Sequence, residues 1–110
     1  MSAFPAIPAS FDRPRGGEVD VLVVAGEHSG DQHAAKVVAD LLAARPGLRI
    51  AAFGGPRLRA AGAQLLFDMT GFSAVGIVEI LSAYPFYRKL FDRMVGWTLR
   101  WKPRLVLLVD

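Results

Sequence analysis

The sequence of 110 residues has no cysteine, which excludes disulfide bonds and thiolate metal sites. Its two histidines, His28 and His33, are too few to hold zinc without help from carboxylates. We therefore expect neither a metal ion nor another cofactor. The net charge of +3 is too small to indicate a nucleic-acid partner. No uncharged apolar run reaches about 18 residues, so we expect no transmembrane helix and take the cytoplasm as the default compartment.

Hydrophobic residues make up 53% of the chain, which is typical of a folded globular domain. Residues 1–17 contain three prolines and lack a long apolar core, so they predict a flexible leader and not a signal peptide. Residues 104–110 predict a buried strand, and no covering helix follows it. We therefore expect residues 18–110 to be part of the N-terminal domain of a longer protein.

Apolar runs alternate with segments of helical periodicity, which predicts an α/β fold with a Rossmann-like parallel sheet and flanking helices. The expected strands are 19–25, 48–53, 64–67 and 105–109, with helices from about 31 to 45 and at 57–61, 77–82 and 85–101. Ser29 is the expected N-cap of the first helix, and Pro85 is either a helix break or a first-turn residue. Right-handed crossovers give the expected strand order 3-2-1-4.

Two acids, Glu27 and Asp110, each follow an expected parallel strand. In the order 3-2-1-4 these two strands are neighbours, and ligands bind where the order reverses. Two carboxylates at that point can deprotonate or orient a hydroxyl group, whereas Glu27 would repel the phosphates of a dinucleotide. The alternative is that Glu27 caps the helix and Asp110 begins a solvated loop.

Ser29 follows a strand at a tight turn, as the nucleophile of many hydrolases does. The hydrolase pattern is Gly-x-Ser-x-Gly, however, and residues 27–31 read Glu-His-Ser-Gly-Asp, so we prefer helix capping with a hydrogen bond to a ligand. Arg57 follows the turn at 54–56 on the same edge of the sheet. It either contacts a phosphate or is a solvated arginine on a short helix.

Residues 76–102 carry more apolar and aromatic side chains than one helix face needs, and their basic residues outnumber the acidic ones by five to two. This combination is typical of a helix that lies at a membrane interface. The alternative is a core helix whose basic side chains reach into water, which is what we expect for residues 91–101. The candidate membrane contacts are Ile77, Val78, Ile80, Leu81, Phe86, Tyr87, Arg88 and Lys89.

Four blocks occur in a fixed order along the chain: AGEHSGD at 25–31, GGPRLRAAG at 54–62, AVGIVEIL at 74–81, and a Lys-Pro pair before the strand that ends in Asp110. From about Val19 onward, this series resembles the N-terminal part of the lipid-A-disaccharide synthases. The resemblance implies a glycosyltransferase with two Rossmann-like domains facing a cleft, the GT-B arrangement.

Such enzymes join UDP-2,3-diacylglucosamine to 2,3-diacylglucosamine 1-phosphate through a β-1,6 linkage and release UDP. The resemblance further implies work at the inner face of the bacterial cytoplasmic membrane. The nucleotide sugar would bind mostly to a C-terminal domain that residues 1–110 do not include. The present domain would supply the acceptor side and the membrane contact.

Residue by residue, Glu27, Ser29 and Gly30 match the family's Gly-Glu-x-Ser-Gly-Asp turn. This match implies a catalytic Glu27 and substrate binding by the other two residues. Asp110 matches the first aspartate of a block that continues Ala-Pro-Asp-Phe-Asn in the family. The implied general base is Asp110, with Glu27 orienting the hydroxyl or the two roles exchanged. His28 stands where the family usually has Ala or Thr, so we assign it no function.

Two other classes of function stay open at this point. An epimerase or hydrolase of the same fold would act on soluble nucleotide sugars and would not need a lipid contact near residues 77–90. A non-catalytic peripheral membrane-binding module would keep the fold without a working cleft.

Overall fold

The computed structural model describes residues 4–71 and 77–109, and for residues 77–80 the backbone alone. The strands are β1 (Val21–Ala25), β2 (Ile50–Gly54), β3 (Gln64–Asp68) and β4 (Leu105–Val109). The helices are α1 (His28–Ala44), α2 (Pro56–Ala61) and α3 (Ile77–Trp101), preceded by the short 3-10 helix η1 (Arg15–Gly17). All strand pairs are parallel and the order is β3-β2-β1-β4, which confirms the predicted Rossmann-like α/β fold.

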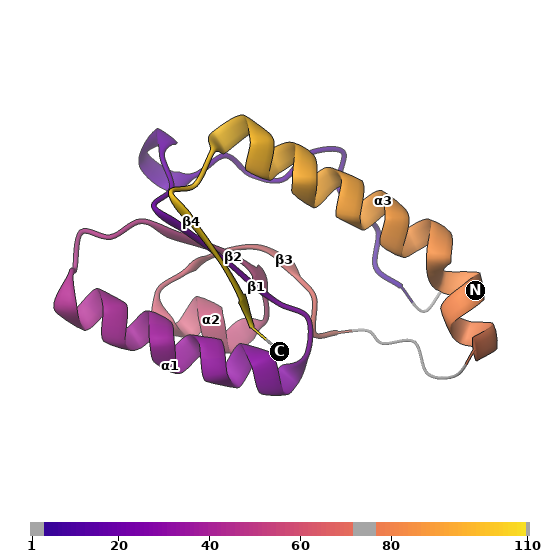
Figure 1. Ribbon diagram of the computed structural model, residues 1–110, viewed down its shortest axis with the longest axis horizontal. Coiled ribbons are helices and arrows are strands. Elements are labelled where there is room, and N and C mark those ends of the chain that lie inside the picture. Colours follow the sequence, from indigo (N-terminus) through magenta and orange to yellow (C-terminus); the bar gives the residue numbers. More distant parts are fainter. Residues whose placement is uncertain (1–3, 72–76, 110) are drawn as a thin grey trace.

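The sheet is the middle one of three layers, with α1 and α2 on one face and α3 across the other (Figure 1). Side chains alternate along β1 because successive residues of a strand point to opposite faces. Val23 packs in the apolar cluster beneath α1 and α2, whereas Leu22 packs in the cluster beneath α3. Phe53 of β2 joins Leu90 and Trp97 of α3 in that second cluster. Apolar contacts on both faces therefore hold the sheet in place, and with it the turns that follow its strands.

The first helix begins earlier than the sequence predicts. α1 starts at His28, with Glu27 in the N-cap position at an extended φ of −135°. The carbonyl of Glu27 accepts the N–H of Asp31 at 2.9 Å, which closes the first turn. Ser29 lies inside that turn, so its predicted place as N-cap is wrong. The prediction relied on the capping preference of serine, but the chain becomes helical two residues earlier.

Pro85 neither breaks nor starts a helix, contrary to our expectation, because α3 runs unbroken from residue 77 to residue 101. An internal proline removes one helical hydrogen bond and crowds the preceding turn. Pro85 is exposed, so water can satisfy the carbonyl that loses its donor. Ala83 and Leu90, on either side of it, are buried, and this packing keeps both halves of the helix in line.

Residues 4–17, which we expected to form a flexible leader, lie along α3 and the sheet (Figure 1). Phe11 is buried, with its ring centroid 4.9 Å from that of Phe53. The Nε1–H of Trp97 donates to the carbonyl of Asp12 at 2.9 Å. The prolines of this segment favour an extended chain, and an extended chain still packs where an aromatic side chain such as Phe11 finds an apolar cluster.

Candidate functional site

Three turns meet at the edge where the parallel strands end, which we call the carboxyl edge. The first turn holds Gly26 and Glu27 after β1, the second joins β2 to α2, and the third follows β3. The N–H of Met69 in the third turn donates to the carbonyl of Gly54, the last residue of β2, at 2.7 Å. In doubly wound sheets ligands bind at this edge, beside the strand where the order reverses. Here that strand is β1, between β2 and β4.

Glu27 lies at this reversal point with an exposed side chain. Although it occupies the N-cap position of α1, its side chain makes no capping hydrogen bond. Glu27 therefore stands at the N-cap position, but the alternative that its carboxylate caps the helix is wrong. An exposed carboxylate beside a sheet crevice is available to contact a hydroxyl group of a ligand.

The predicted binding residues divide between two neighbouring turns. Ser29 is exposed in the first turn of α1, next to Glu27, and Gly30 is buried in the same turn. Because Gly30 is buried and has no side chain, only its backbone N–H can donate a hydrogen bond to a ligand. Arg57 lies in the first turn of α2 with an exposed side chain. The fold thus brings all four residues to the carboxyl edge.

The buried carboxylate at this edge belongs to Asp31, which is 1% exposed. Its oxygens accept the backbone N–H groups of Gly55, Arg57 and Leu58 at 2.9, 3.0 and 3.1 Å. These groups begin α2, whose N-cap residue offers no side-chain hydrogen bond. A carboxylate already occupies the N-terminus of α2, so any phosphate contact of Arg57 would come from its side chain.

We did not predict this contact from the sequence. A Cβ atom on Gly55 would lie 2.5 Å from Oδ2 of Asp31 and 2.7 Å from Cγ2 of Thr70. The glycine therefore permits a close approach that another residue would block. The sequence does contain one indication of the contact. The Gly-Gly-Pro turn opens a helix without a side chain that can cap it, so the first N–H groups of that helix need an acceptor from another part of the chain.

Asp110, the other predicted catalytic acid, lies outside the described residues. The residue before it, Val109, pairs with Ala25, the residue at the end of β1. The β1–β4 pairing confirms that the two acids follow neighbouring strands, as the sequence predicts. The distance between their carboxylates stays a prediction.

Of the candidate membrane contacts, Leu81, Arg88 and Lys89 have exposed side chains on α3. Phe86 and Tyr87 are half-buried. The side chains of Ile77, Val78 and Ile80 lie outside the described part of the chain. No helix in the described residues is long and apolar enough to span a membrane.

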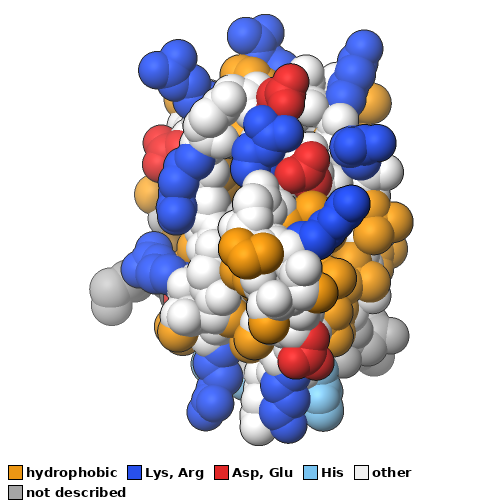
Figure 2. Space-filling model, turned by 90° about the vertical axis from the view of Figure 1, so that its left-hand side faces the viewer, with side chains coloured by type: hydrophobic (Ala, Val, Ile, Leu, Met, Phe, Trp, Pro, Cys, Tyr) orange, Lys and Arg blue, Asp and Glu red, His pale blue; other side chains and the backbone are white. Residues whose placement is uncertain are grey.

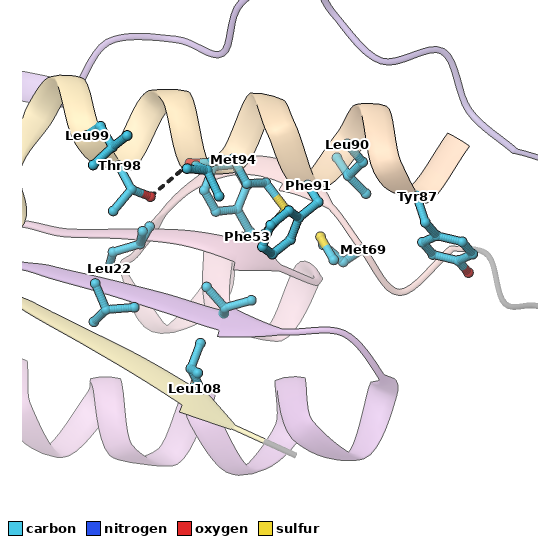
Figure 3. A pocket seen from close by; sticks show the side chains of 13 residues that line it. Leu22, Phe53, Met69, Tyr87, Leu90, Phe91, Met94, Thr98, Leu99 and Leu108 are labelled. Atoms are coloured by element: carbon cyan, nitrogen blue, oxygen red, sulfur yellow. Dashed lines mark hydrogen bonds between the residues drawn. The ribbon is translucent and has the colours of Figure 1, made fainter. Parts of the chain in front are cut away.

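An apolar groove of about 490 Å³ runs between α3 and the β1–β4 side of the sheet (Figure 3). Its lining includes Leu22, Phe53, Leu90, Met94, Leu99 and Leu108. Among the described residues that line the groove, none is acidic or basic. The hydroxyl of Thr98 donates to the carbonyl of Met94 at 2.8 Å. The described residues of the groove thus offer apolar contacts and no acid or base, whereas the exposed carboxylate of Glu27 lies at the carboxyl edge.

The opposite end of the molecule, where the strands begin, is rich in basic side chains (Figure 2). There the backbone N–H and the guanidinium of Arg49 donate to the carboxylate of Asp20 at 2.8 and 3.4 Å. The backbone hydrogen bond is the larger of the two effects that hold the pKa of Asp20 below its ordinary value, and the guanidinium hydrogen bond is the smaller. Among the described side chains, those of residues 4–71 and 81–109, no three His, Asp or Glu residues gather to hold a metal ion.

A parallel sheet of order 3-2-1-4 with an exposed acid at its reversal point defines a ligand-binding domain of the Rossmann-like class. The sequence profile described as "Lipid-A-disaccharide synthetase" matches residues 21–110. The chain belongs to this family.

Several curated relatives align over 90 residues, which is 82% of the chain. Lipid-A-disaccharide synthase 1 of Legionella pneumophila (strain Lens) is 43% identical, and the lipid-A-disaccharide synthase of Myxococcus xanthus (strain DK1622) is 44% identical. That of Nitrosococcus oceani is 40% identical. The alignment covers 23–24% of these relatives, so the chain spans about a quarter of their length. No solved structure matches the chain.

Proposed function

We propose that the protein that carries this chain is a glycosyltransferase that forms the disaccharide of lipid A. It would condense UDP-2,3-diacylglucosamine with 2,3-diacylglucosamine 1-phosphate and release UDP. The observation that carries the proposal is the exposed carboxylate of Glu27 at the reversal point of the sheet, in a chain of this family. The present domain supplies the acceptor side of the cleft, and a further GT-B domain binds the donor.

The chemistry needs a group that removes a proton from an alcohol. The 6-hydroxyl oxygen of the acceptor attacks the anomeric carbon of the donor, and the bond from that carbon to the UDP oxygen breaks with inversion. The proton passes to Asp110 as general base, and UDP leaves with the electron pair of the broken bond. Glu27 orients the hydroxyl or exchanges roles with Asp110, while Ser29 donates to or accepts from the sugar at the start of α1.

The test measures UDP release by the full-length protein, given the donor with and without the acceptor. Release that depends on the acceptor supports the synthase. Release without acceptor indicates a hydrolase or another enzyme that consumes the donor, and no release from a folded protein overturns the proposal. In the active protein, Asp110→Asn is expected to lower turnover by about two to four orders of magnitude.

A lipid substrate brings the enzyme to the membrane, so we place it peripherally on the inner face of the cytoplasmic membrane. Support comes from α3, where the exposed apolar side chains of Leu81 and Tyr84 lie near the exposed Arg88 and Lys89. Apolar and basic side chains together favour an anionic lipid interface. Flotation of the full-length protein with anionic vesicles tests this placement, and failure to float overturns it.

A further inference from the structure

The N-terminal arm, which we define as residues 4–14, lies outside the part of the chain that the family profile matches. Its first eight residues, Phe4 to Phe11, contain no charged side chain and include two prolines. Proline fixes φ and favours an extended chain, so this segment loses little conformational entropy when it packs. The question is what an ordered, uncharged arm adds to the domain.

The base of the arm is fixed to the domain by several contacts. Phe11 is buried, with ring centroids 4.9 Å from Phe53 and 5.9 Å from Phe67. The carbonyl of Asp12 accepts from Trp97 at 2.9 Å, and the carbonyl of Arg13 accepts from the side chain of Gln64 at 3.0 Å. The base therefore holds a constant position relative to α3 and the sheet.

The tip of the arm rests on the N-terminal half of α3. The ring of Phe4 stacks on that of Phe86 at 4.6 Å and meets the edge of Tyr87 at 5.8 Å. Further along the arm, the guanidinium of Arg93 donates to the carbonyl of Pro8. The contact of Phe4 with Phe86 therefore places the tip beside the N-terminal half of α3, at the end of the molecule opposite the starts of the strands (Figure 1).

The surroundings of the tip are apolar and basic. Leu81 and Tyr84 of α3 are 68% and 58% exposed, and Arg88 and Lys89 are exposed beside them. Aromatic rings that are partly exposed tend to lie at the level of the lipid headgroups in a bilayer. Lysine and arginine side chains near them attract anionic lipids.

We propose that the tip of the arm, residues 4–7, forms one lipid-contact surface with α3, and that the parts of the half-buried Phe4 and Ile7 that stay exposed leave water for an anionic membrane. This inference rests on the membrane association proposed above, and it adds a segment that the family match does not include. The charge complementarity of Arg88 and Lys89 selects an anionic lipid surface as the partner. Since the base is anchored, the arm presents its tip without an ordering cost at the time of binding.

The test uses the full-length protein with two vesicle types, phosphatidylcholine alone and phosphatidylcholine mixed with phosphatidylglycerol. In the double variant Phe4→Ser/Ile7→Ser, partition onto the anionic vesicles is expected to fall about tenfold, since the exposed parts of these two half-buried apolar side chains no longer leave water. Val37→Ser is the matched control, because Val37 is an apolar residue 42% exposed on α1, on the other face of the sheet. Deletion of residues 2–9 is expected to give the same loss and keeps the anchor at Phe11.

The outcomes separate this inference from the proposal on which it rests. If the unmodified protein does not bind anionic vesicles, the membrane association itself is wrong. If the unmodified protein binds and both arm variants bind equally well, the membrane association stands and the role of the arm is overturned. Tighter binding by the arm variants also overturns it, because the arm would then be a cover over α3.

Discussion

The carboxylate of Asp31 accepts the backbone N–H of Gly55 at 2.9 Å, and this buried hydrogen bond joins the first turn of α1 to the turn that opens α2. The same carboxylate accepts the N–H of Leu58 at 3.1 Å. An N-cap residue normally satisfies such groups locally, whereas here the acceptor comes from another helix. The turn that carries Glu27 and the turn that precedes Arg57 are therefore held in one fixed arrangement.

Replacing Asp31 by asparagine is expected to lower the free energy of unfolding by about 1–3 kcal/mol. The amide NH₂ would face backbone N–H donors that the carboxylate now satisfies. Urea denaturation at neutral pH measures the change. Asp40→Asn is the matched control, because Asp40 is exposed on the same helix, and it is expected to change the free energy by no more than about 0.5 kcal/mol. Equal effects of the two substitutions would contradict the capping role of Asp31.

Gly55→Ala tests the close approach from the other side. The new Cβ atom would lie 2.5 Å from Oδ2 of Asp31, so the carboxylate or the turn must shift, at an expected cost of about 1–3 kcal/mol. Gly47→Ala is the control, since a Cβ atom there meets nothing within 4 Å. A Gly55 variant as stable as the Gly47 variant would show that the two turns can separate at no cost.

The strand order and the place of Glu27 were predictable because they depend on local patterns. Apolar runs mark the strands, helical periodicity marks the segments between them, and right-handed crossovers leave few ways to order the sheet. Once the order was set, the position of Glu27 after the first strand put it at the reversal point. Nothing in these steps requires knowledge of a particular side-chain contact.

The contacts that the sequence did not predict join residues far apart in the chain. Asp31 and Gly55 are 24 positions apart, and Trp97 and Asp12 are 85 apart. Capping propensity favoured Ser29 over Glu27 because it considers a helix alone, without the strand that leads into it. In the same way, the rule that proline breaks a helix considers only the local backbone. It does not take into account the packing of the buried face that keeps α3 continuous around Pro85.

The ion pair at the opposite end gives a pH dependence with a definite sign. The N–H and guanidinium of Arg49 lower the pKa of Asp20 from its ordinary value of 3.8 in the folded state. The stabilisation is therefore present above about pH 3.8 and is lost as the pH falls through the lower folded-state pKa. In urea denaturation between pH 2 and pH 7, the difference between the unmodified protein and Asp20→Asn is expected to shrink below about pH 4. A difference that stays constant with pH would show that the carboxylate charge of Asp20 does not contribute.

Neighbouring residues of α3 test which face of the helix meets the sheet. Leu90 is 2% exposed in the cluster with Phe53, whereas Phe91 is 65% exposed. Leu90→Ala is expected to lower the free energy of unfolding by about 2–5 kcal/mol, and Phe91→Ala by about 1 kcal/mol or less. Urea denaturation of both variants measures the contrast. A larger loss for Phe91 would mean that α3 is rotated about its axis.

Glu27→Gln separates catalysis from stability. The side chain of Glu27 is exposed and makes no capping hydrogen bond, so the free energy of unfolding is expected to change by no more than about 0.5 kcal/mol. Turnover of the full-length protein, followed as UDP release that depends on the acceptor, is expected to fall because the neutral amide no longer orients the attacking hydroxyl with a charge. A fall of about 10²–10⁴-fold, as large as that expected for Asp110→Asn, would mean that the two acids exchange roles and that Glu27 takes the proton.

Glu18→Gln is the matched control for this substitution. Glu18 is exposed at the opposite end, where it pairs with Arg49 at 2.8 Å, and an exposed pair of this kind contributes little to stability. Its replacement is expected to leave turnover unchanged. If Glu27→Gln keeps full turnover while Asp110→Asn loses it, the base is Asp110 alone and Glu27 does not touch the reacting hydroxyl. If both variants keep full turnover, neither acid acts in the reaction, and the proton acceptor must come from another part of the protein.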